Sequence, residues 1–155
     1  MPRPKTYTLT AMIADYKATS RWRRLADNSV RAYKAAFDTI LPMRIIGTKP
    51  LGDTAGQAIR PIHAEAIYAH LCDNNALATA NLYISVMRSL FSAANKLELV
   101  EHNPFTAIML LPAPERDVSW SPDNIERFIM TSDAHGIKSI GTLALIAYDL
   151  CQRPI

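Results

Sequence analysis

The chain has 155 residues, of which 49% are hydrophobic and 20% charged, and its formal net charge at pH 7 is +3. This length allows one sizeable core, or one domain with part of another, and the composition is ordinary for a globular protein. Ala and Leu are plentiful and no stretch alternates polar and apolar residues with a period of two, which argues against β-strands. The sequence therefore predicts an all-α fold.

The spacing of cysteines and histidines argues against a disulfide framework and against a metal site. Cys72 and Cys151 lie far apart, and the four histidines have no ligand spacing. The N-terminus lacks the apolar core of a signal peptide, and apolar runs such as residues 143–147 are too short to span a membrane. We therefore expect no bound metal, no membrane partner and a cytoplasmic location.

Apolar spacing predicts three helices in the first half of the chain. The first begins after Thr8, a favoured N-cap residue, and the second runs from about Asp27 to Leu41. Residues 21–24, Arg-Trp-Arg-Arg, form a basic loop between them. Several Gly and Pro residues exclude a long helix over residues 42–61, and a third helix follows Pro61.

A fourth helix is predicted over residues 79–97 by two opposed stripes. The apolar stripe, at alternating spacings of four and three, consists of Ala80, Ile84, Met87, Phe91 and Ala94. The polar stripe consists of Asn81, Ser85, Arg88, Ser92 and Asn95. It contains no acid, whereas an ordinary exposed face mixes Glu with Lys. We interpret it as a face laid against DNA, since phosphates repel carboxylates; a plain exposed face is the alternative.

The sequence after the fourth helix predicts a short apolar helix over residues 105–111, followed by a linker. Residues 112–118 are bounded by proline, charged and without apolar periodicity. The run Ser121-Pro122-Asp123 is typical of a helix start. A last helix over about 137–150 is apolar on most sides, so we expect it to be buried in something larger.

The basic side chains are concentrated in the front of the chain. Residues 1–111 carry 13 Lys and Arg against 8 Asp and Glu, whereas residues 112–155 carry 4 against 6. An excess of Lys and Arg in one part of the chain is expected of a protein that binds the phosphate backbone of nucleic acid. A soluble surface that happens to be basic is the alternative.

Several segments, in this order, resemble the tyrosine recombinase (phage integrase) family. Its last core-binding helix resembles Ala78-Thr79-Ala80-Asn81, residues 86–91, Ala94 and Asn103-Pro104. The entry into its catalytic domain resembles Trp120-Ser121-Pro122-Asp123 with Ile125, and the approach to its first catalytic arginine resembles residues 143–150 followed by Cys151-Gln152-Arg153-Pro154. The resemblance implies a four-to-five-helix SAM-like core-binding bundle over residues 1–111, a linker over 112–118 and the first helices of a truncated catalytic domain over 119–155.

The resemblance also implies an activity. Members of this family cut and rejoin DNA at specific sites through a 3′-phosphotyrosyl intermediate, without metal or other cofactor. Arg153 would be the catalytic arginine, because a guanidinium contacts two non-bridging oxygens of the transition state at once. The nucleophilic tyrosine has no counterpart here, so this chain is expected to be inactive alone. Implied partners are double-stranded DNA and, in the full-length protein, other recombinase protomers in a tetramer on DNA.

By the same resemblance, the second and fourth predicted helices approach the major groove. The expected DNA-binding side chains are Arg21, Arg23, Arg24, Arg31, Lys34, Thr79, Asn81, Ser85, Arg88 and Ser92. Two other functions stay open. One is a non-catalytic helical module that binds DNA as an accessory or regulatory factor, and the other is a helical bundle that binds only protein.

Overall fold

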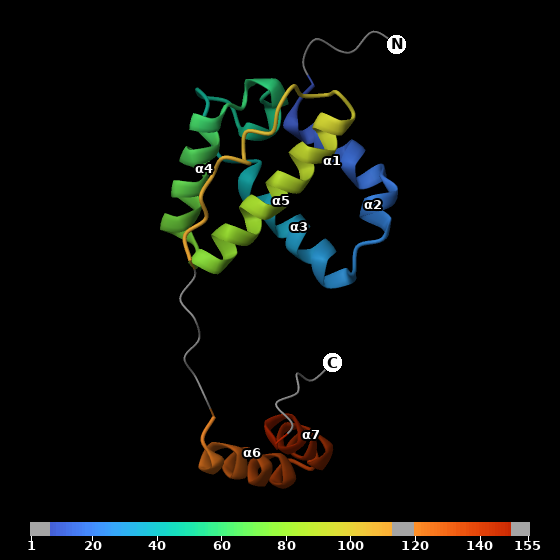
Figure 1. Ribbon diagram of the computed structural model, residues 1–155, viewed down its shortest axis with the longest axis vertical. Helices are drawn as coiled ribbons and strands as arrows, with labels where there is room; N and C mark the ends of the chain where they lie inside the picture. Colours follow the sequence, from blue (N-terminus) through green and yellow to red (C-terminus); the bar gives the residue numbers. More distant parts are fainter. Residues whose placement is uncertain (1–6, 113–119, 150–155) are drawn as a thin grey trace. The chain divides into compact units, whose positions relative to one another are not determined.

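The computed structural model describes residues 7–112 and 120–149. These ranges are mostly helical and contain no β-strand; an isolated antiparallel bridge joins Thr8 and Ala55. The predicted all-α class is therefore confirmed. The chain forms two compact units, Met1–Ala113 and Pro114–Ile155 (Figure 1). No helix in the described ranges is long and apolar enough to cross a membrane.

The first unit is a bundle built around one long helix. Its elements are α1 (Leu9–Ala18), α2 (Ser20–Arg23), α3 (Asp27–Ile40), the 3-10 turns η1 (Leu51–Asp53) and η2 (Gly56–Ala58), α4 (Pro61–Asn74) and α5 (Leu77–Lys96). Helix α5 packs against α1, α3 and α4, and Figure 1 shows it crossing in front of α3 between α4 and α1. The predicted first, second and third helices correspond to α1, α3 and α4.

Threonine caps explain where the first two helices begin. The Thr8 hydroxyl accepts a hydrogen bond from the Ala11 N–H, as predicted, and the Thr19 hydroxyl accepts one from the Trp22 N–H at 3.3 Å. Thr19 also ends α1. The basic segment 21–24 was expected to be a loop, and this is wrong, because the second cap starts a one-turn helix there.

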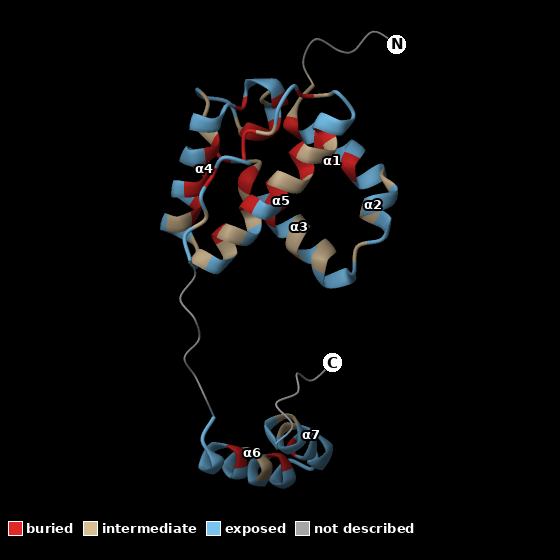
Figure 2. Ribbon diagram, in the orientation of Figure 1, coloured by how far each residue is buried: buried red, intermediate tan, exposed pale blue. Residues whose placement is uncertain are grey.

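The apolar stripe of α5 forms the centre of the core. All five residues predicted for it are buried, and so are Val86 and Leu90, because helices cover α5 on more than one side. Figure 2 shows the buried residues along the facing sides of the helices. Phe91 packs against Phe105, with ring centroids 5.1 Å apart, and both side chains are fully buried. Phe105 therefore anchors the segment after α5 to the core.

That segment, residues 98–112, is called the strap. It runs back along α4 and α5 toward the turn between these helices (Figure 1). The helix predicted over residues 105–111 is wrong: residues 104–107 form a turn and residues 108–112 have no regular structure. The carbonyl oxygens of Phe105 and Ile108 accept hydrogen bonds from the Arg88 side chain. These side-chain bonds satisfy two carbonyl groups of the strap without a helix.

The second unit is a hairpin of α6 (Pro122–Ala134) and α7 (Lys138–Asp149). The predicted start of α6 is confirmed, with Ser121 as N-cap and proline in the first turn. Gly136 makes the turn with a φ of +74°. The helices approach closely at Gly141, where a Cβ would lie 3.3 Å from the Cα of Ile129. Most large apolar side chains of α7 stay exposed in this unit.

Several predictions fall on residues outside the described ranges. These are residues 113–118 of the linker predicted over 112–118, Cys151 and the proposed catalytic Arg153. The assignment of the two compact units to a core-binding domain and a catalytic fragment also stays a prediction.

Candidate nucleic-acid interface

An aromatic cluster fixes the position of the short helix α2. Its members are Tyr16 from α1, Trp22 from α2, and Tyr33 and Phe37 from α3. The Trp22 ring lies edge-on to Tyr33 at 5.9 Å and stacks on Phe37 at 6.4 Å. Aromatic pairs at such distances add to the stability that area burial supplies. Because Trp22 is held on two sides, its neighbours in α2 are held as well.

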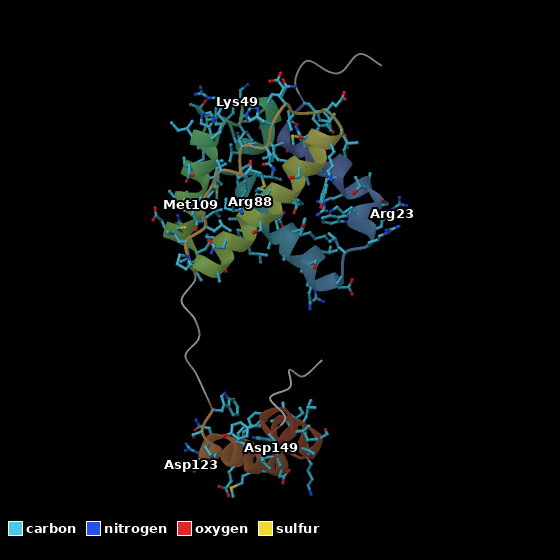
Figure 3. The ribbon with its side chains drawn as sticks, in the orientation of Figure 1. Arg23, Lys49, Arg88, Met109, Asp123 and Asp149 are labelled. Carbon is cyan, nitrogen blue, oxygen red and sulfur yellow. The ribbon has the colours of Figure 1, made fainter. Side chains whose placement is uncertain are left out.

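The three arginines around Trp22 point outward. Arg21, Arg23 and Arg24 are exposed, and together they are called the α2 arginine cluster. The side chains of Arg23 and Arg24 form no hydrogen bond or ion pair with any described residue, and Figure 3 shows Arg23 at the outer edge of the bundle. On α1, the exposed carboxylate of Asp15 accepts a hydrogen bond from the Tyr7 hydroxyl. Trp22 thus holds the short helix that carries the cluster, and the guanidinium groups of Arg23 and Arg24 are uncommitted.

Lys17 belongs to the same end of the bundle, although it was not among the predicted site residues. Its Nζ lies 5.8 Å from the Trp22 ring centroid and 5.7 Å from that of Phe37. A cation over an aromatic face is attracted by the ring. Lys17 therefore adds positive charge beside α2 and helps to hold Trp22. Its place in the basic front of the chain was the only indication in the sequence.

The basic residues of α3 have a different electrostatic setting. Arg31 and Lys34 are exposed, as expected of residues that could meet DNA. Asp27 lies one turn before Arg31, and Asp38 lies one turn after Lys34, so all four share one face of the helix. The two acids balance the two bases on this face. An approaching phosphate would therefore meet much less net attraction here than at α2.

The polar stripe of α5 does not form an open face. Arg88 Nε donates to the Phe105 carbonyl at 2.9 Å, and its guanidinium also donates to the Ile108 carbonyl. Asn81 Nδ2 donates to the Leu111 carbonyl at 2.8 Å. The strap therefore occupies donors of both side chains, so these donors are not left free for DNA, and contact of this stripe with DNA stays a prediction.

The rest of the stripe also bonds within the molecule. Ser92 Oγ accepts from Asn103 Nδ2 at 2.9 Å, and Asn95 Nδ2 donates to the carbonyls of Val100 and Glu101 at 3.1 and 2.8 Å. Ser85 Oγ donates to the carbonyl of Asn81 one turn earlier at 2.9 Å. The strap presents mostly carbonyl oxygens to α5, and carboxylates would repel them. This explains the absence of acids, which the sequence could not separate from a phosphate-binding pattern.

Two further residues define this surface. Thr79 is half-buried in the first turn of α5, which begins at Leu77, two residues earlier than predicted. Tyr68 was missed: its hydroxyl donates to Asn81 Oδ1 at 2.7 Å and accepts from the Leu111 N–H at 2.8 Å. Burial raises the pKa of Tyr68, and the bond from Leu111 opposes this rise. Tyr68 thus helps to hold the strap on the bundle.

Comparison of the chain with protein-family models, curated proteins and solved structures found no match. No group of three or more His, Cys, Asp or Glu side chains that could hold a metal occurs within residues 7–112 and 120–149.

Proposed function

We propose that this chain is the DNA-binding part of a site-specific tyrosine recombinase, and that it grips duplex DNA through the α2 arginine cluster. The observation that carries the proposal is the setting of Arg23 and Arg24. Both are exposed and uncommitted, on a helix that Trp22 fixes to the bundle. A guanidinium presents a planar fork of donors that matches phosphate oxygens, and a fixed helix lowers the entropy lost on binding.

The proposed DNA-contacting surface contains fewer residues than the sequence predicted. On α5, Asn81 and Arg88 are engaged by the strap, and on α3 the charges of Arg31 and Lys34 are balanced. Arg21, Arg23, Arg24 and Lys17 remain as a group of positive charges at one end of the bundle. A compact positive group of this kind supplies the sequence-independent part of DNA affinity.

The recombinase assignment is supported by the order of segments that resemble that family. The second unit would be the beginning of the catalytic domain. Arg153 would donate to the non-bridging oxygens of the scissile phosphate while a tyrosine elsewhere attacks it. Losing such a donor typically lowers the rate by a factor on the order of 100 to 1000. This chain would bind DNA without cutting it.

The test is a fluorescence anisotropy titration of a labelled duplex at several salt concentrations. We expect a Kd on the order of 10⁻⁴ to 10⁻⁶ M, weakening steeply as salt rises. Arg23→Glu with Arg24→Glu should weaken binding about tenfold or more, and equally for unrelated sequences. The matched control is Arg31→Glu with Lys34→Glu, which changes the net charge by the same amount and should weaken binding clearly less.

Two results would contradict DNA binding through α2: binding that does not depend on salt, or equal losses in the two double variants. The recombinase assignment is tested separately by sequencing the gene beyond codon 155. A reading frame that continues into further arginine motifs and a tyrosine supports it. A stop codon directly after codon 155 would favour the non-catalytic DNA-binding module.

A further inference from the structure

A shallow pocket of about 380 Å³ lies on the side of α6 that does not face α7. The side toward α7 carries Ile129 and Ser132, which lie against Gly141. The pocket, called the Trp120 pocket, is lined by Trp120, Asn124, Arg127, Phe128 and Thr131. Its helical members follow one another at spacings of three and four, so they share one side of α6. A pocket of this size is typical of sites for small ligands, such as a single nucleobase.

Trp120 supplies a fixed aromatic surface in this pocket. Its ring lies edge-on to Phe128, with centroids 5.3 Å apart and an interplanar angle of 72°. Aromatic pairs prefer this arrangement, which stabilises the position of the indole. The contact covers at most one face of the indole, and Trp120 remains 44% exposed. The pocket therefore offers a flat aromatic ligand a surface on which to stack.

Two polar side chains of the pocket are uncommitted within the described part of the chain. The Asn124 amide and the Arg127 guanidinium form no hydrogen bond or ion pair with any described residue, and both side chains are exposed. An amide offers donors and an acceptor, and a guanidinium offers several donors in one plane. Side chains of these types bind the polar edge of a nucleobase, while an aromatic ring binds its face.

The charge at the pocket is nearly balanced. Asp123 lies one turn before Arg127 on α6, and both are exposed, so the two charges largely offset each other. A phosphate backbone would therefore find little net attraction here. An unpaired base is different, because its stacking on an aromatic ring contributes affinity without net charge. Balanced charge beside an exposed indole thus favours a base over a phosphate.

We propose that the second unit binds an unpaired base of single-stranded nucleic acid in the Trp120 pocket. The base stacks on Trp120, and its edge forms hydrogen bonds with Asn124 and Arg127. The proposed function assigns duplex DNA to the α2 arginine cluster in the first unit, and this proposal does not rest on it. Stacking of one base on an aromatic residue strengthens binding by a factor on the order of ten.

The test uses the full chain carrying Trp22→Phe, so that Trp120 is the only tryptophan. A single strand of oligothymidylate is compared with an abasic strand of the same length and charge. Anisotropy of labelled strands gives the two affinities, and Trp120 emission with unlabelled strands reports stacking. We expect oligothymidylate to quench Trp120 and to bind about tenfold more tightly than the abasic strand. This ratio should change little with salt, because stacking needs no net charge.

Trp120→Leu should remove the preference for the strand with bases, and Trp120→Phe, which keeps an aromatic ring, should retain most of it. Arg127→Gln removes an exposed, uncommitted side chain, so the fold should persist while the preference falls several-fold. The matched control is Tyr148→Leu, because Tyr148 is an exposed aromatic residue of the same unit that does not line the pocket. It should leave the preference unchanged.

Equal affinities for the two strands, equal quenching by both, or equal losses in Trp120→Leu and Tyr148→Leu would each overturn the proposal. Arg23→Glu with Arg24→Glu should weaken both strands alike and leave their ratio unchanged, because phosphates supply that part of the affinity. A failure of the α2 arginine cluster to bind DNA is thereby seen separately from a failure of the Trp120 pocket.

Discussion

The Tyr68 hydroxyl accepts a hydrogen bond from the N–H of Leu111, 43 residues further along the chain, at 2.8 Å. The same hydroxyl donates to Asn81 Oδ1, and Asn81 Nδ2 donates to the Leu111 carbonyl. Both polar backbone groups of Leu111 are therefore bound by side chains from α4 and α5. This clasp fixes the end of the strap on the bundle and so sets where the chain leaves the first unit.

Tyr68→Phe should loosen the clasp without unfolding the bundle. The variant leaves the Leu111 N–H and Asn81 Oδ1 without their partner, which costs about 1 to 2 kcal/mol in the free energy of unfolding. Amide hydrogen exchange should show the Leu111 N–H exchanging faster, while the α5 core stays protected. Tyr83→Phe is the matched control, because the half-buried Tyr83 hydroxyl bonds to no described residue. Equal exchange at Leu111 in both variants would contradict the role of Tyr68.

Substitutions of Arg88 and Arg23 should have different effects on stability and on DNA binding. Arg88→Met keeps the aliphatic packing but removes the donors to two strap carbonyls, so it should cost about 2 to 4 kcal/mol in urea unfolding. Arg23→Met removes the same charge from an exposed, uncommitted position and should change stability by less than about 0.5 kcal/mol. At a temperature where both variants are folded, Arg23→Met should weaken DNA binding more. The reverse order would place the DNA contact on α5.

Trp22 should matter for DNA binding although it carries no charge. Trp22→Ala removes the contacts with Tyr33 and Phe37 and the ring beneath Lys17, so α2 should lose its fixed position. We expect a loss of about 2 to 3 kcal/mol in stability for this half-buried aromatic residue. DNA affinity should fall several-fold under conditions where the protein remains folded. Trp22→Phe keeps an aromatic ring and should retain most of the affinity, which anisotropy at constant salt can measure.

The fold was largely predictable because its helices carry apolar spacing, and α1 and α6 also carry their own boundary residues. Thr8, Ser121 and Pro122 mark helix starts by local chemistry, and the apolar stripe of α5 is buried as its period indicates. The strap was not predictable in this way. Residues 105–111 are apolar enough for a helix, but their conformation is decided by Arg88 and Asn81, which are distant in sequence.

The candidate site was predictable only in part, for a related reason. Carbonyl and phosphate oxygens are both acceptors, so the acid-free stripe containing Arg88 suits either partner, and only the folded chain shows the strap on it. The balance of charge on α3 could have been found from the spacing of Asp27 and Asp38 around Arg31 and Lys34. The seating of Trp22 depends on contacts across three helices, which no local pattern indicates.

We expect Tyr16 to lower the stability of the fold at alkaline pH. Its side chain is 3% exposed, and its hydroxyl has no hydrogen-bond partner within the described residues. Burial raises the pKa of Tyr16 from 10.0 to about 12; the neighbouring Tyr33 adds to the rise and Arg21 opposes it. Burying an unpartnered hydroxyl is unfavourable, so Tyr16→Phe should leave the free energy of unfolding at pH 7 unchanged or raise it by up to about 1 kcal/mol.

The sign of the pH effect follows from which state holds the proton. Above pH 10 the unfolded chain releases the Tyr16 proton while the folded chain retains it up to about pH 12, so stability is complete below pH 10 and falls between these values. The total loss is about 2 to 3 kcal/mol for a shift of this size. Urea unfolding at pH 7, 10 and 11 should show this decline in wild type and a shallower one in Tyr16→Phe, which keeps the smaller contribution of Tyr68. An equally steep decline in both proteins would mean that other groups cause it.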